Sequence, residues 1–130
     1  MIDVLAIVSG KLATAIPSVK WFVGFVPENQ ALPYGTVSAP NPSNVDSMFG
    51  GSTVETCDIR VSVLGIDSSL IKCHASSIKS ALHRADIDSS VYSGQSMLAS
   101  RGFNELDVDA NGNQIYEEYL IFTVVVAELV

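Results

Sequence analysis

The sequence predicts an α+β fold in which two helices pack on a mainly antiparallel sheet, in the order α-β-β-loop-β-α-β-β. Three observations carry this prediction: two stretches with apolar residues at helical spacing, one stretch of apolar–polar alternation, and an Asn-Gly pair before a long apolar segment. The chain has 130 residues, of which 48% are hydrophobic and 16% charged, which is enough apolar surface for a core. We therefore expect residues 1–130 to form a single domain.

The N-terminal stretch predicts a helix over residues 2–16, because small and apolar side chains recur near the helical period before Pro17. Residues 20–26 are aromatic and β-branched, which favours a strand. Residues 31–37 predict a second short strand, entered through Pro33. Because proline donates no ladder hydrogen bond, Pro33 is expected at the start of a strand or on an edge of the sheet. The side chains expected on the buried side of the helix are Ile2, Leu5, Ala6, Ser9, Leu12, Ala13 and Ile16.

Residues 38–52 are rich in Pro, Asn, Ser and Gly and show no periodicity, so a long loop is expected. A connection of this length without structure of its own is unusual in a compact domain, which suggests a functional or a mobile segment. Val45, Met48 and Phe49 are bulky apolar residues within it. They either return to the core or contact a partner protein, and on the second reading they are candidate interface residues.

The clearest strand is predicted over residues 54–64, where Cys57, Ile59, Val61 and Val63 alternate with polar residues. The next helix is predicted over residues 67–84. It begins at Asp67, a good N-cap residue, and places Lys79, His83 and Arg84 near its C-terminus, where the helix dipole favours positive charge. Its expected apolar stripe is Ile71, Ala75, Ile78, Leu82 and Ala85.

The C-terminal part predicts a hairpin. Residues 91–103 form a weaker extended segment, and Asn111-Gly112 is typical of a two-residue type I′ turn with positive φ at both positions. The last strand is predicted over residues 115–129. It is apolar on both faces over residues 119–127, so we expect a central strand that is covered on both sides.

One motif matches a calcium loop: Asp107-x-Asp109-x-Asn111-Gly112, five further residues and then Glu118. An EF-hand needs a helix after this loop, whereas the residues that follow are β-branched and aromatic. We therefore expect an acidic hairpin tip, with a weak cation site as the alternative. No cofactor and no metal centre is expected.

No catalytic residues are expected either, and we expect no enzyme activity. His74 and His83 are nine residues apart and project to opposite sides of a helix, so we expect solvated or capping roles. Cys57 and Cys73 are interpreted as two buried thiols in a reducing compartment rather than as a disulfide. No serine lies in a G-x-S-x-G context.

Charge and hydropathy exclude further classes. The net charge is −7, and residues 104–130 hold six acidic residues and no Lys or Arg, which disfavours binding to nucleic acid. The longest apolar run is about half the length that a membrane helix needs. No targeting signal is recognised, and we expect a soluble, cytoplasmic product where the protein is made.

The order of features is similar to that of the tail-completion (tail-terminator) family of long-tailed bacteriophages. The features are the helix over 2–16, the strand ending at Pro27, the element Leu32-Pro33-Tyr34, the strand over 54–64, the helix over 67–84 and the hairpin over 97–129. The layout covers nearly the whole chain. Two features depart from the family: a basic residue before the first proline is absent, and the 38–52 segment is long and Pro-rich.

The resemblance implies a structural virion protein of the tail or neck. It implies a ring, six-fold in this family, that caps the tail tube, stops its polymerisation and joins it to a head connector protein. Its expected partners are further copies of the chain, the tail-tube protein and the head connector. DNA would pass through the bore without sequence-specific binding, and no membrane is involved. A head–tail connector or stopper ring is the alternative within the virion, and a small cytoplasmic ligand-binding or regulatory domain is the alternative from another class.

Overall fold

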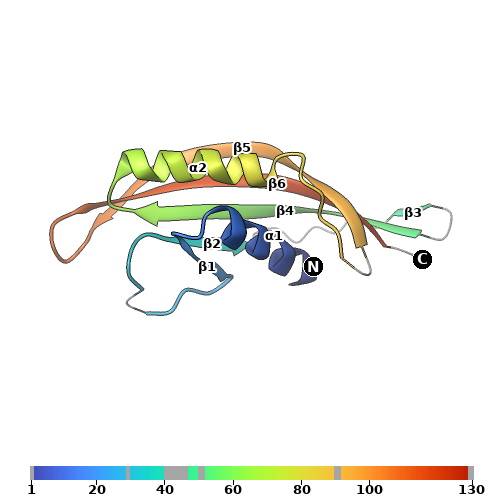
Figure 1. The fold of residues 1–130 in the computed structure, drawn as a ribbon, viewed down its shortest axis with the longest axis horizontal. Helices are drawn as coiled ribbons and strands as arrows, with labels where there is room; N and C mark the ends of the chain where they lie inside the picture. Colours follow the sequence, from blue (N-terminus) through green and yellow to red (C-terminus); the bar gives the residue numbers. More distant parts are fainter. Residues whose placement is uncertain (1, 29, 40–46, 50–51, 90–91, 129–130) are drawn as a thin grey trace.

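Two helices lie on one face of a six-stranded sheet in the computed structural model, which describes residues 2–28, 30–39, 47–49, 52–89 and 92–128 (Figure 1). The arrangement confirms the α+β prediction, with one difference. The 38–52 segment holds a short strand, β3, where a loop without regular structure was expected. The elements are α1 (Ile2–Ala15), β1 (Lys20–Val23), β2 (Tyr34–Ser38), β3 (Ser47–Phe49), β4 (Ser52–Gly65), α2 (Ser68–Leu82), β5 (Tyr92–Val108) and β6 (Gln114–Glu128).

The strands follow the order β1-β2-β4-β6-β5, and β3 pairs with the beginning of β4. β1 and β2 are parallel, and the other pairs are antiparallel. β4, β5 and β6 run along the long axis of the molecule, with the β5–β6 turn at one end and β3 at the other (Figure 1). The sheet is therefore mainly antiparallel, as the sequence predicts.

The core lies between the helices and one face of the sheet. In β4 the alternating residues Cys57, Ile59, Val61 and Val63 are buried, as predicted. The α2 stripe is confirmed over Ile71, Ala75, Ile78 and Leu82, whereas Ala85 lies beyond the end of the helix. From β6, the side chains that meet this layer are Leu120, Phe122, Val124 and Val126.

The buried side of α1 differs from the prediction. Val4, Val8, Leu12 and Ile16 are buried, in steps of four residues, while Ala6 and Ala13 are exposed and Leu5 and Ser9 are only partly buried. α1 contacts β1, β2 and α2, so its neighbours determine which side of the helix faces the core. Small residues at helical spacing do not carry that information.

The ends of α2 follow the prediction. The Asp67 carboxylate accepts hydrogen bonds from the backbone N–H groups of Ser69 (3.0 Å) and Leu70 (3.2 Å). At the other end His83 is the capping residue, and its backbone N–H donates to the Lys79 carbonyl at 2.8 Å. Arg84 follows with φ 61°, so a non-glycine residue takes the left-handed conformation that ends the helix.

The β5–β6 turn is longer than the expected two-residue type I′ turn. It spans residues 109–113, and of its residues Gly112 has a positive φ, at 83°, whereas Asn111 does not. The Asp109 carboxylate accepts hydrogen bonds from the backbone N–H groups of Asn111 (2.9 Å) and Asn113 (2.8 Å). This side chain stabilises a wider turn, in which one glycine suffices.

β6 lies between β4 and β5, as expected for a central strand, but the helices cover only one of its faces. On the other face Ile121 is partly exposed and Val125 is 44% exposed. The prediction of cover on both sides is therefore wrong for this chain alone. The strand is apolar on both faces because of its sequence, whereas cover depends on where the helices pack.

Candidate assembly surface

Two of the three interface residues predicted from sequence, Met48 and Phe49, lie at the β3 end of the molecule. Met48 and Phe49 belong to β3, where Met48 pairs with Thr53 and Phe49 with Ser52 across a short hairpin. Val45 lies outside the described residues. The backbone of residues 47–49 thus extends the sheet at one end of the long axis (Figure 1).

Leu32-Pro33-Tyr34 occupies the junction before β2. Tyr34 begins the strand, and its ring lies edge-on to the Phe22 ring of β1 with 6.1 Å between centroids. Leu32 and Pro33 line a small cavity of about 60 Å³ with the β4–α2 turn. Gly65, the last residue of β4, also lines this cavity, and a Cβ placed on it would lie 3.5 Å from the Pro33 Cβ. The β1–β2 connection thus lies beside the beginning of α2, which is a structural role.

The face of the sheet opposite the helices, here called the open face, presents a mixed surface. Arg60 of β4 lies over the Tyr119 ring of β6, with its guanidinium carbon 4.3 Å from the centroid, and pairs with Glu117 at 3.3 Å. Thr123 donates a hydrogen bond to Asp58 at 3.0 Å. Polar and aromatic side chains thus contact one another across the middle of a face that neither described helix covers.

A groove of about 750 Å³ lies at the hairpin end of the molecule. Its lining combines the apolar residues Leu64 and Ile115 with the acidic residues Glu105, Asp107 and Asp109. The hydrogen bond from the backbone N–H of Asn113 is the main cause that lowers the pKa of the Asp109 carboxyl below its usual value. Further lining residues are Gln30, Leu32, Tyr34 and Leu106.

The calcium-loop residues are arranged as a hairpin rather than as a ligand shell. The Asp109 carboxylate is engaged with its own turn, as described above. Glu117 and Glu118 project to opposite faces of β6: Glu117 pairs with Arg60 on the open face, and Glu118 pairs with Arg101 on the helix side. Among the residues that the structure describes, no group of three His, Cys, Asp or Glu side chains gathers as metal ligands.

A basic groove lies on the helix side, between α2 and β5. It has a volume of about 480 Å³ and is lined by Lys79 and His83, by Arg101 from β5 and by the serines Ser76 and Ser80. The backbone N–H of Leu98 donates to His83 Nδ1 at 3.0 Å, which attaches the end of α2 to β5. Sequence analysis found the bases of α2, but it did not indicate that Arg101 joins them. Residue 101 follows a register shift between Leu98 and Ser100, and that shift was not apparent in the sequence.

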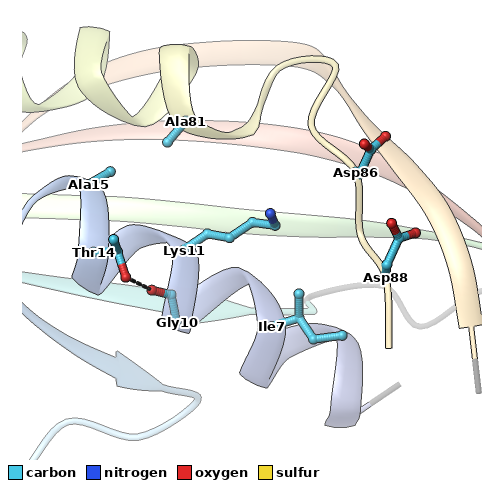
Figure 2. A pocket seen from close by; sticks show the side chains of 8 residues that line it. All are labelled: Ile7, Gly10, Lys11, Thr14, Ala15, Ala81, Asp86 and Asp88. Carbon is cyan, nitrogen blue, oxygen red and sulfur yellow. Dashed lines mark hydrogen bonds between the residues drawn. The ribbon is translucent and has the colours of Figure 1, made fainter. Parts of the chain in front are cut away.

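A third groove, of about 600 Å³, runs between α1 and the segment that follows α2 (Figure 2). Lys11 extends along it from α1, while Asp86 and Asp88 approach from the opposite wall. The Thr14 hydroxyl donates to the Gly10 carbonyl at 3.0 Å, so this hydroxyl is satisfied within its own helix.

The histidines and cysteines are placed partly as expected. His83 is a capping residue, but His74 is buried, and burial lowers the pKa of its imidazole below 6.5. Cys57 is buried on β4, whereas Cys73 is exposed on α2, so the prediction of two buried thiols is wrong for Cys73. Helical phase explains this, because Cys73 projects away from the stripe through Ile71 and Ala75. Neither described helix is long and apolar enough to span a membrane.

Comparisons with known proteins give a likeness in structure. No family model matches the chain, and no curated protein sequence matches it significantly. Its structure is similar to a solved chain described as "Virion of native gene transfer agent (GTA) particle", with a TM-score of 0.66 and 18% sequence identity. The likeness covers 96% of this chain and 94% of that chain. At this level of identity the likeness shows the fold alone.

Proposed function

We propose that this chain is a structural protein of a phage-like virion and that it acts there as a tail terminator. The observation that carries the proposal is the likeness over 96% of the chain to a chain from a gene transfer agent virion. The order of elements, which resembles the tail-completion family, supports the finer role. In this role the protein forms a ring that caps the tail tube, stops its polymerisation and joins it to the head connector.

The physical features of the chain suit such a ring. A closed ring needs two different complementary surfaces on each copy, and this molecule offers an uncovered sheet face, an acidic hairpin end and a basic groove. The net charge of −7 suits a conduit, because negative charge around a bore repels the DNA backbone. The role requires no catalysis and no cofactor.

A tube-growth experiment tests the role. Short tubes of the tail-tube protein from the same particle are incubated with this chain, free tube subunits are added, and tube lengths are measured by electron microscopy. We expect a ring at one tube end and arrested growth at that end. If tubes elongate to the same length as in the control without this chain, the terminator role is contradicted.

The same proteins separate the alternatives. A connector or stopper ring would bind the head connector and leave tube growth unchanged. A regulatory domain would remain a monomer or dimer and bind neither protein. Native mass spectrometry distinguishes these cases by the number of copies in each complex. The samples are the chain alone, the chain with tube ends and the chain with the head connector.

A further inference from the structure

The hairpin end carries charge and apolar surface that its own chain leaves unpaired. Glu105 and Asp107 are exposed there, and among the described residues neither has a cationic side chain within 4 Å. Leu106 and Val108 beside them are 39% and 56% exposed. Exposed acidic and apolar side chains on a projecting hairpin are typical of a surface that a partner covers.

The basic groove has the complementary character. Lys79 is exposed and has no acidic partner among the described residues. Arg101 keeps 40% of its side chain exposed although one of its nitrogens pairs with Glu118. His83 and two serines complete a lining that can donate several hydrogen bonds to carboxylates.

Geometry prevents the two surfaces from meeting within one chain. The hairpin turn lies at one end of the long axis, beyond the beginning of α2, whereas Lys79 lies in the last turn of α2 (Figure 1). Along β5, Arg101 is four residues from Glu105 and six from Asp107, which corresponds to about 13 and about 20 Å of strand and is farther than an ion pair reaches. Within the described residues Arg101 pairs with Glu118, so a carboxylate for Lys79 would come from another molecule.

From these observations we infer that the acidic hairpin end of one copy docks into the basic groove of the next copy, through Glu105 and Asp107 against Lys79 and Arg101. The inference rests on the proposed function, and it identifies the two surfaces that form the ring contact. Each copy carries one hairpin end and one groove, so the contact is head-to-tail and can close on itself. The net charge of −7 disfavours nucleic acid as the occupant.

Charge reversal in the full chain tests this contact. Asp107→Lys and Lys79→Glu should each weaken self-association about tenfold or more in sedimentation experiments at low salt, because each places like charges against each other. The Asp107→Lys/Lys79→Glu double variant should regain association. An equimolar mixture of the two single variants should also assemble, with the variants alternating, because every contact in such a ring again joins opposite charges.

Matched controls carry the same change in charge elsewhere. Asp86→Lys and Lys11→Glu reverse charges of the α1 groove, and neither should alter self-association beyond the effect of net charge. Circular dichroism melting confirms that every variant is folded. Three outcomes overturn the inference. The wild-type chain stays monomeric, the single charge reversals assemble normally, or the groove binds duplex DNA and Lys79→Glu abolishes that binding. The tube-growth experiment with the wild-type chain judges the proposed function separately.

Discussion

Arg101 on β5 forms an ion pair of 2.8 Å with Glu118 on β6, and the Glu118 side chain is only 8% exposed. Its second oxygen, Oε2, is buried without a hydrogen-bond partner among the described residues. The stability of this carboxylate therefore depends on a single cation. Arg101 is the more exposed partner and also lines the basic groove, so one side chain serves both the fold and the proposed contact.

Removing only the cation should destabilise the protein. Arg101→Met leaves a buried carboxylate unpaired, and we expect a loss of about 2–3 kcal/mol in the free energy of unfolding. The Arg101→Met/Glu118→Leu double variant should recover most of it, because no charge is then left buried. Denaturant unfolding measures both, with Lys79→Met as a surface control expected within about 0.5 kcal/mol of wild type. A double variant less stable than Arg101→Met contradicts this account.

Two glycines should respond to alanine in opposite directions. A Cβ on Gly35 of β2 would lie 2.2 Å from Cζ3 of Trp21, so Gly35→Ala should displace the indole and cost about 1–3 kcal/mol. A Cβ on Gly10 of α1 meets nothing within 4 Å, so Gly10→Ala should stabilise the helix by about 0.5–1 kcal/mol. Thermal unfolding of the two variants beside the wild type provides the comparison. Equal shifts in the same direction would show that the Trp21 contact does not govern the site.

The buried imidazole of His74 should make stability depend on pH. Burial lowers its pKa in the folded state below 6.5, so the unfolded chain binds more protons at mildly acidic pH. Stability should fall as pH drops below about 6.5, and His74→Gln should remove that part of the dependence. The pKa of Asp109 is also lowered, so the stability that this carboxylate adds is present above its usual pKa of 3.8 and is lost only below it. The two effects are therefore separated in melting curves taken across pH. A variant with the wild-type pH dependence would count against the burial argument.

The acidic turn should not hold calcium tightly. The Asp109 carboxylate accepts hydrogen bonds from its own turn, and Glu118 pairs with Arg101 on the far side of β6 from Glu117. Calorimetry should therefore show no saturable Ca²⁺ binding tighter than about millimolar. A micromolar constant that Asp107→Ala abolishes would restore the calcium-loop interpretation.

The 38–52 segment remains a candidate assembly arm, and the structure determines how to test it. β2 ends at Ser38, which pairs with Arg60 of β4. β4 itself begins at Ser52, eight residues before Arg60. A replacement segment must therefore span about 26 Å to connect the two strands. Replacing residues 41–51 by eleven Gly and Ser residues should leave a folded chain, because β3 lies off the main strand order.

If Met48 and Phe49 anchor a partner, that replacement should abolish docking to the tail tube or to a neighbouring copy. The Met48→Ser/Phe49→Ser variant, with the rest of the segment intact, is the matched test of the two side chains. Normal tube capping by both variants refutes the arm, and loss of folding in the replacement shows that the segment belongs to the core.

Local patterns were sufficient for most of the elements. The alternation through Ile59 and Val61 predicted β4 and its buried face, and Asp67 marked the beginning of α2. The opposite orientation of Glu117 and Glu118 followed from strand geometry alone. These features depend on residues close together in the chain, so periodicity and capping chemistry reveal them.

The remaining features depend on which distant segments meet. The sequence could not show that Val4 and Val8 face the core, that one face of β6 stays uncovered, or that Arg101 joins the bases of α2. Each depends on strand order, register and helix placement, which are contacts between residues far apart in the sequence. Hydrophobic burial drives such packing without regard to direction, so only the assembled sheet and helices decide which faces are covered and which charges become neighbours.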